Sequence, residues 1–485
     1  MAIRTGAQYI ESLRDDRALY IDRKLVRDVT THAPLKGVID TIARVYDQQH
    51  DEQHQDMLTF SSPSSGDRVS KTYLEAKTEE EFRQLSACFH LRTQSTFGLM
   101  GRLTDFMSGY LMDQLSGLRV MGKSEAAEKA QSILDNSREN DLQVTHALVD
   151  PQSDKSKPEA PSEALHIVER RSDGVVVSGA RMLSTLAPVA NECYIGPYLA
   201  RQKGEEDYAL AFQIPMNTPG FSILGRGSFD QGEGTFDRPL TSRFDEGDAI
   251  LVFEEAFIPN ERLIVAGDLE AYNGMMRFGI GYTAIQACTR STMKLRFLAG
   301  LATAVSRANG RDKTPHYQTS IGELMGLINV AEGIRSGAVV DSLRKITAFE
   351  QGHMMYEGDG LGEAKFQGMS GFAALNVFFP YAATKAADVL RLAAGSGVLA
   401  VTEGDYENPE VKSLLDRWLI GPDTTAEHRL KLMKLAWDMT GTEFGSRAGL
   451  YERLYSGEHE RNCQIWFMSP TTTECEQLAN NIFEL

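Results

Sequence analysis

Three short stretches of the 485-residue sequence combine residue types that could do chemistry. In "GRLTDFMSGY" (101–110), Arg102 is a lone cation between apolar and aromatic side chains. An unpaired guanidinium is costly to bury, so Arg102 must reach water, meet a carboxylate or bind an anion. Asp105 is close enough along the chain to be its partner within a helix, and an anionic ligand is the alternative.

The other two stretches place a histidine and a threonine beside hydrogen-bonding or small residues. "THALVDPQSDKSKP" (145–158) puts His146 ahead of a loop whose polar groups could line the edge of a cofactor. "SGARMLSTLAPVANECYIGPY" (178–198) puts Thr185 in a segment with little side-chain bulk. For any one stretch alone, a structural role is the more frequent outcome.

The elements that must position these residues change type twice along the chain. Residues 1–145 are predicted to form a mostly helical domain, residues 146–275 a β domain and residues 276–485 a helical bundle. Because strands and helices do not alternate, a doubly wound α/β fold is disfavoured and an α+β class is expected.

Local signals support this division. Thr78 with Glu81, and Thr424 with Glu427, have the spacing of capping boxes that begin helices. "ALHIVERRSDGVVVSGARML" (164–183) is two runs of strand-forming residues around a Ser-Asp-Gly turn, which predicts a hairpin. The apolar residues between 321 and 338 recur at helical spacing.

Composition excludes several classes of function. The net charge of −17 argues against nucleic acid or an anionic membrane as the main partner. The five cysteines are scattered and form no CxxC pair, so they indicate a reducing cytoplasm and supply no zinc or iron–sulfur ligand set. With no apolar signal segment and no nucleotide-binding fingerprint before a helix, a cytoplasmic protein that does not itself bind NAD(P)H is expected.

Taken together, the stretches resemble one family. "GLMGRLTDF" (98–106), "THALVDPQSDKS" (145–156), "GARMLSTLAPVANE" (179–192) and "DAILVFEEAFIPNERL" (248–263) are similar to segments of the 4-hydroxyphenylacetate 3-monooxygenase oxygenase components. Further matching text runs almost from end to end. The resemblance implies an acyl-CoA dehydrogenase-like fold, with an N-terminal helical domain, a central β-barrel or sandwich and a C-terminal bundle, assembled as a homotetramer.

The resemblance also implies roles for particular residues. Arg102 and His146 would be catalytic and would hold the phenolic oxygen of the substrate. The other substrate-binding positions would be Phe106, Pro197 and Tyr198. The positions implied for the flavin are His146, Gln152, Ser153, Asp154, Lys155, Thr185 and Gly457.

The implied activity is that of an FADH2-dependent aromatic monooxygenase. A separate NAD(P)H-flavin reductase would supply FADH2, and O2 would react with it to give a C4a-hydroperoxyflavin that hydroxylates a phenol or a related aromatic compound. A cation and an imidazole suit this reaction because they stabilise a phenolate, the electron-rich form of the substrate. No metal is implied.

Phe106 departs from the family pattern, which has a tyrosine there. Either another hydroxyl, of which Tyr110 and Tyr198 are the candidates, donates from another direction, or the substrate has no phenolic oxygen at that place. We favour the second explanation, because a site that binds a phenolate gains little by losing a donor.

Other functions remain open from the sequence. A related flavin and iron–sulfur dehydratase that acts on an acyl-CoA needs cysteine ligands near Arg102, and none is present. An acyl-CoA dehydrogenase would use Glu357 of "MYEG" as its base, but the signature that should follow is missing. His50 and His54, four residues apart in a polar stretch, could ligate zinc. A flavin-binding relative without hydroxylase activity is the last alternative.

Overall fold

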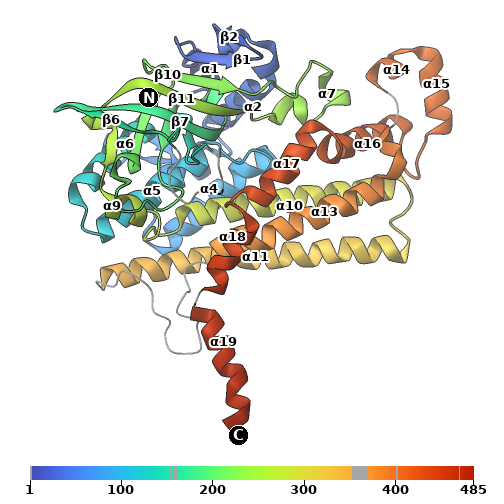
Figure 1. Cartoon of the computed structure of the whole chain (residues 1–485). Coiled ribbons are helices and arrows are strands. Elements are labelled where there is room, and N and C mark those ends of the chain that lie inside the picture. Colours follow the sequence, from blue (N-terminus) through green and yellow to red (C-terminus); the bar gives the residue numbers. More distant parts are fainter. Residues whose placement is uncertain are drawn as a thin grey trace.

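The computed structural model describes residues 3–151, 156, 162–351, 370–399, 402–468 and 470–484. It confirms the predicted order of helices, then strands, then long helices (Figure 1). The main sheets occupy one end of the molecule, and the long C-terminal helices run past them. The last helix points away from the body.

The N-terminal part contains six helices and two strand pairs. The helices are α1 (Gly6–Glu11), α2 (Lys36–Asp47), α3 (Gln55–Leu58), α4 (Glu79–Ser95), α5 (Thr104–Val120) and α6 (Ser124–Glu139). The strands are β1 (Ala18–Ile21), β2 (Lys24–Val26), β3 (Thr59–Ser61) and β4 (Arg68–Ser70). The capping box predicted at Thr78 is confirmed at the start of α4, where the Thr78 side chain accepts from the Glu81 amide.

The central part forms two sheets that pack face to face. Its strands are β5 (Val144–Ala147), β6 (His166–Arg170), β7 (Gly174–Thr185), β8 (Glu192–Ile195), β9 (Leu210–Pro215), β10 (Phe221–Gly225), β11 (Asp248–Pro259) and β12 (Leu263–Ala266). Short helices α7 (Gly234–Asp237), α8 (Thr241–Phe244) and α9 (Leu269–Gly274) join them. One sheet has the order β2-β1-β10-β11-β7-β6 and the other β12-β9-β8-β5.

The pairing of the strands shows how the first residues of the chain enter this core. β1 pairs in parallel with β10, so the N-terminal hairpin extends the six-stranded sheet. The predicted hairpin of β6 and β7 is confirmed as an antiparallel pair. Between the sheets, the rings of Phe212 and Phe253 meet edge to face at 6.1 Å. β5, which carries His146, is an edge strand of the second sheet and pairs in parallel with β8.

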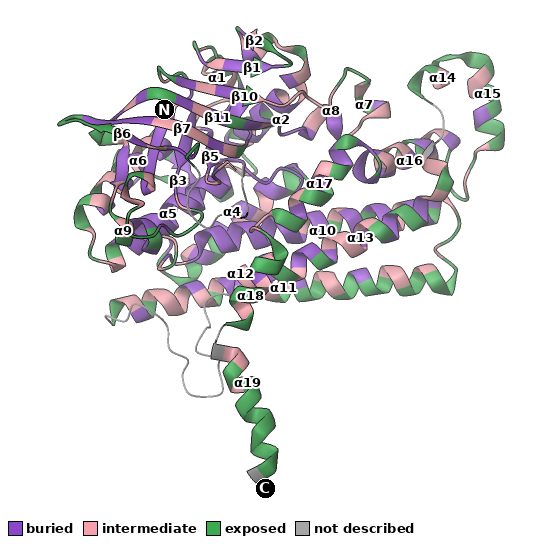
Figure 2. Ribbon diagram, viewed as in Figure 1, coloured by how far each residue is buried: buried purple, intermediate pink, exposed green. Residues whose placement is uncertain are grey.

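The C-terminal part is a bundle built around one buried helix. Its helices are α10 (Tyr282–Ala308), α11 (Pro315–Glu350), α12 (Ser370–Ala373), α13 (Phe379–Ala394), α14 (Glu403–Glu407), α15 (Pro409–Trp418), α16 (Ala426–Thr440), α17 (Glu443–Leu454), α18 (His459–Phe467) and α19 (Pro470–Asn480). α10 packs against α4, α5, α11 and α13, and most of its residues are buried (Figure 2). α14, α15 and α19 lie mostly exposed.

One local prediction in the bundle needs correction. The second capping residue is Thr425, which accepts from the His428 amide, and not Thr424, which is paired with Gly421 in an isolated bridge before the helix. The helical spacing predicted over residues 321–338 is confirmed by α11, whose apolar side is partly buried, with Met325 exposed. No helix within the described ranges is long and apolar enough to cross a membrane.

Candidate active site

Arg102 lies in the turn just before α5 and is held between aromatic rings. Its side chain is buried, with 8% of the residue exposed. The guanidinium carbon is 4.0 Å from the ring centre of Phe106 and 4.2 Å from that of Tyr455. The guanidinium also donates to the carbonyls of Gly101 and Tyr455, at 3.2 and 3.4 Å. These contacts fix the cation between α5 and the end of α17.

Asp105 is not the partner of Arg102, which corrects the first of the two sequence interpretations. Arg102 precedes the helix, whereas Asp105 stands in its first turn and turns toward α10. There its carboxylate accepts from the Gln286 side chain at 3.0 Å and from the Phe106 amide at 3.0 Å. Burial raises the pKa of Asp105, and its hydrogen bonds and the charge of Arg92 only partly oppose that rise.

Glu246 lies near Arg102 but is paired elsewhere. Its carboxylate accepts from the backbone amides of Gly101 and Arg102, at 2.8 and 3.3 Å, and forms an ion pair with Arg447 at 2.8 Å. Among the residues that the structure describes, no carboxylate forms an ion pair with Arg102. A buried guanidinium without its own counter-ion favours an anionic ligand.

His146, on the four-stranded sheet, lies beside the aromatic rings that surround Arg102. It sits on β5 opposite Tyr194 of β8, and its ring centre lies 5.4 Å from that of Phe106. Both ring nitrogens are buried and have no partner within the described part of the chain. Burial, together with the positive charge of Arg102, lowers the pKa of His146 well below 6.5. The imidazole is therefore neutral at physiological pH and has one nitrogen to donate and one to accept.

Pro197, Tyr198 and Gly457 meet beside this group. The Pro197 carbonyl accepts from the hydroxyl of Tyr110 at 3.1 Å. The Tyr198 hydroxyl lies against the backbone of Gly457, where a Cβ would come within 2.7 Å of it. Gly457 has a φ of +101°, which L side chains rarely adopt. Glycine is thus required here both by conformation and by space.

Thr185 is engaged in a network of charges next to the site. Its hydroxyl donates to Asp248 at 2.8 Å, and Asp248 also pairs with Arg447 at 2.7 Å and with Arg226 at 3.2 Å. Burial would raise the pKa of Asp248, but the two guanidinium groups outweigh it and lower that pKa to about 2. Thr185 thus helps to hold an ionised carboxylate at the end of β7.

Five of the residues singled out from the sequence cannot be placed relative to the site. Gln152, Ser153, Asp154, Lys155 and Glu357 lie outside the described residues.

The two histidines of the candidate zinc site have protein partners. His50 Nε2 lies 3.1 Å from the Arg4 carbonyl, and His54 Nδ1 lies 3.0 Å from Asp51. Within the described ranges, no group of three or more His, Cys, Asp or Glu residues is placed to hold a metal ion.

Sequence reasoning missed the contribution of α17. Tyr451 and Tyr455, four residues apart in "YERLY", stack edge to face at 5.4 Å beside Arg102. Between them, Glu452 pairs with Arg290 at 2.7 Å and with Lys294 at 2.9 Å, all three fully buried or nearly so. The spacing of the two tyrosines was the available signal, because it places both rings on one face of a helix.

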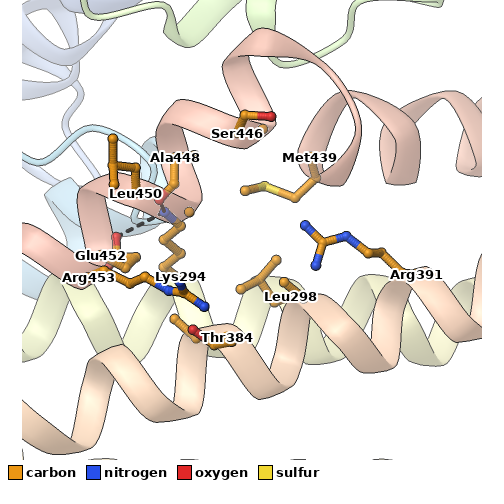
Figure 3. Close-up of a pocket in the computed structure, with 14 residues that line it drawn as sticks. Lys294, Leu298, Thr384, Arg391, Met439, Ser446, Ala448, Leu450, Glu452 and Arg453 are labelled. Carbon is orange, nitrogen blue, oxygen red and sulfur yellow. Dashed lines mark hydrogen bonds and ion pairs between the residues drawn. The ribbon is translucent and has the colours of Figure 1, made fainter.

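The Glu452 cluster separates the site from a cavity in the bundle. Figure 3 shows this cavity between α17 and the pair α10 and α13, with Lys294, Arg391 and Arg453 turned toward it. Its volume is about 310 Å³. None of the site residues predicted from the sequence and described by the structure lines it.

Comparison with known proteins settles the family. Residues 5–265 match the family described as "4-hydroxyphenylacetate 3-hydroxylase N terminal", and residues 275–484 match "4-hydroxyphenylacetate 3-hydroxylase C terminal". The chain belongs to the 4-hydroxyphenylacetate 3-hydroxylase family. The resemblance inferred from the sequence is confirmed.

Relatives and solved structures cover nearly the whole chain. A 4-hydroxyphenylacetate 3-monooxygenase oxygenase component of Geobacillus sp. (strain PA-9) is 30% identical and covers 96% of this chain and 94% of its own. A 4-nitrophenol 2-monooxygenase oxygenase component of Rhodococcus sp. is 30% identical over 94% of this chain and 86% of its own. The crystal structure of a 4-hydroxyphenylacetate 3-monooxygenase oxygenase component complexed with FAD and 4-hydroxyphenylacetate is 29% identical. Its TM-score is 0.88, with 99% of this chain and 98% of that chain covered.

More distant structures bear on the fold alone. An archaeal 4-hydroxybutyryl-CoA dehydratase from N. maritimus has a TM-score of 0.82 at 20% identity, covering 99% of this chain and 95% of its own. A glutaryl-coenzyme A dehydrogenase has a TM-score of 0.50 at 10% identity, covering 95% of this chain and 93% of its own. The predicted α+β, acyl-CoA dehydrogenase-like architecture is thus confirmed.

Proposed function

We propose that this chain is the oxygenase component of a two-component, FAD-dependent monooxygenase that hydroxylates a phenol. The observation that carries the proposal is the buried Arg102, which has no counter-ion in the described part of the chain and lies against the same Phe106 ring as the neutral His146. Such a pair suits a phenolate, whose negative charge Arg102 would neutralise while His146 donates a hydrogen bond to its oxygen.

The residues beside this pair fit a flavin. The ring nitrogens of His146 are buried without a partner in the described part of the chain, and Gly457 has a left-handed backbone conformation beside the Tyr198 hydroxyl. We propose that His146, Thr185, Gly457 and the segment Gln152 to Lys155 hold FAD. When bound in its reduced form, FAD supplies the activation of O2, and the chain's own residues orient the phenol and exclude water.

Reduced FAD would come from a separate reductase. Solved relatives are complexed with FAD, and several relatives carry the name of an oxygenase component. The sequence has no nucleotide-binding fingerprint, which is consistent with electrons arriving on a diffusing flavin.

The test supplies the purified chain with a flavin reductase, NADH, FAD and O2, together with 4-hydroxyphenylacetate, 4-nitrophenol or phenylacetate, which lacks the hydroxyl. We expect hydroxylated product by mass spectrometry from at least one phenol and none from phenylacetate. Without the reductase, NADH should not be consumed. Formation of hydrogen peroxide alone with every phenol would contradict the proposal and would favour a flavin-binding relative without hydroxylase activity.

We also propose that the chain assembles as a homotetramer. α19 extends from the body and exposes Leu478, and the turn after it exposes Ile482 and Phe483 (Figure 2). Apolar side chains on a projecting arm favour docking on another copy of the chain. Sedimentation at micromolar concentration is expected to give a tetramer. Ending the chain before α19 should shift it to smaller species, and a monomer in the full-length protein would overturn the proposal.

A further inference from the structure

The ring nearest to Arg102 belongs to Phe106, which carries no hydroxyl. The next nearest ring belongs to Tyr455, whose centre lies 4.2 Å from the Arg102 guanidinium carbon. The rings of Phe106 and Tyr455 meet edge to face at 6.2 Å. A phenol bound against Arg102 would therefore lie next to the ring of a tyrosine that comes from the end of α17 rather than from α5.

Tyr455 is held in place from both sides. Its backbone carbonyl accepts from Arg102, and its ring also packs on the Arg290 guanidinium at 4.6 Å. Arg290 is itself fixed by its ion pair with Glu452 at 2.7 Å. The ring thus lies against two guanidinium groups that the fold holds rigidly, so its hydroxyl has a defined position.

The hydroxyl of Tyr455 is buried and has no hydrogen-bond partner in the described part of the chain. Leaving a buried donor unpaired is unfavourable, which favours a ligand as its partner.

The other tyrosines around the site are placed differently. The Tyr110 hydroxyl donates to the Pro197 carbonyl at 3.1 Å. The Tyr451 hydroxyl is also buried without a partner in the described part of the chain, but it lies against Gly101, and its ring centre is farther from the Arg102 guanidinium carbon, at 5.5 Å. The Tyr198 hydroxyl lies against Gly457. Neither Tyr110 nor Tyr198, the two donors considered from the sequence, is therefore as well placed as Tyr455. This arrangement favours the first explanation for Phe106, a donor from another direction, over the second, which the sequence favoured.

We infer that the Tyr455 hydroxyl donates a hydrogen bond to the phenolic oxygen of the substrate and so selects for ligands that bind as phenolates. This inference rests on the proposed function, since it assumes that the aromatic substrate binds against Arg102. It gives Tyr455 a role in specificity: a ligand without the oxygen anion leaves the hydroxyl unpaired, and a ligand with it gains one charge-assisted bond.

Ligand binding without turnover tests the inference. The full-length chain with oxidised FAD is titrated with 4-nitrophenol, whose phenolate absorbs visible light, and with nitrobenzene, which lacks the oxygen. For Tyr455→Phe we expect the Kd of 4-nitrophenol to rise about tenfold or more, as for loss of a hydrogen bond to a charged group, with the Kd of nitrobenzene changed less than twofold. The apparent pKa of the bound 4-nitrophenol should rise as well. Tyr406→Phe serves as the control and should change the Kd of neither ligand, because the hydroxyl of Tyr406, on α14, donates to Asp416 at 2.9 Å, outside the site.

Two results would overturn the inference. Equal weakening of both ligands would mean that the ring only shapes the site, and unchanged binding of 4-nitrophenol would mean that the hydroxyl does not reach the substrate. Unfolding in urea without ligand adds a third check, because Tyr455→Phe should be at least as stable as the wild type if no protein group pairs with the hydroxyl. Because none of these measurements requires hydroxylation, failure here is distinct from failure of the monooxygenase proposal.

Discussion

Replacing Arg102 by methionine is expected to lower the rate of coupled hydroxylation by about 10²–10³-fold, the usual effect of removing one group that stabilises a developing anion. Methionine keeps an unbranched side chain among the rings of Phe106 and Tyr455 while it removes the charge. Without the cation the substrate binds as a neutral phenol, which is a poorer nucleophile. Reduced FAD should still be oxidised, with the oxygen released as hydrogen peroxide.

The measurement compares product, hydrogen peroxide and NADH consumed in the same assay. Arg119→Met is the control, because Arg119 stands in the last turn of α5, the helix that follows Arg102, and pairs there with Glu75 at 3.0 Å on the surface. Its coupling should match that of the wild type. Wild-type coupling in Arg102→Met would show that Arg102 does not face the substrate.

Replacing His146 by glutamine is expected to reduce coupled product by about 10²–10³-fold, within the usual range for a group that positions or moves a proton. Glutamine can imitate one ring nitrogen but cannot both donate and accept along the imidazole directions. His166→Gln is a suitable control, because His166 lies on β6 with Nδ1 against the Ala164 carbonyl at 2.8 Å, away from Arg102. Unchanged coupling in His146→Gln would place His146 outside the reaction.

The same variant should alter how stability depends on pH. Burial and Arg102 hold the pKa of His146 well below 6.5 in the folded chain, so below pH 6.5 the unfolded chain binds a proton that the folded chain does not. The stability that comes from a neutral His146 is therefore complete above pH 6.5 and is lost as the pH falls below it. The wild type should lose stability relative to His146→Gln by up to about 1.4 kcal/mol per pH unit. If the free energies of unfolding of the wild type and of His146→Gln, measured in urea, change in parallel between pH 7.5 and 5, this prediction is wrong.

The order of the elements was predictable because it depends on local patterns. The spacing of apolar residues and the capping residues around Thr78 can be recognised from a few neighbouring positions, because both reflect the local geometry of a helix. Where the pattern was ambiguous by one position, as at Thr424 and Thr425, two adjacent threonines could each have capped the helix.

The site was only partly predictable, because its decisive contacts join distant segments. Arg102 and Tyr455 lie 353 residues apart, and Glu246 binds the Gly101 amide from 145 residues away. Nothing in the local sequence of Arg102 indicates either contact. The Asp105 interpretation failed for a related reason: the helix begins after Arg102, so the spacing of the two residues does not place them on one helical face.

The lone charge of Arg102 also sets a limit on the stability of the chain. A buried cation without a counter-ion destabilises the folded state, and an apolar residue of similar size at this position would remove that penalty. Selection for stability alone would therefore eliminate Arg102. Its presence indicates that the chain is less stable than it could be because activity requires the charge. An anion that binds beside it stabilises the folded chain by mass action. The lifetime of such a protein in a cell would then depend on the concentration of its own substrate, and it would be longest when that concentration is high.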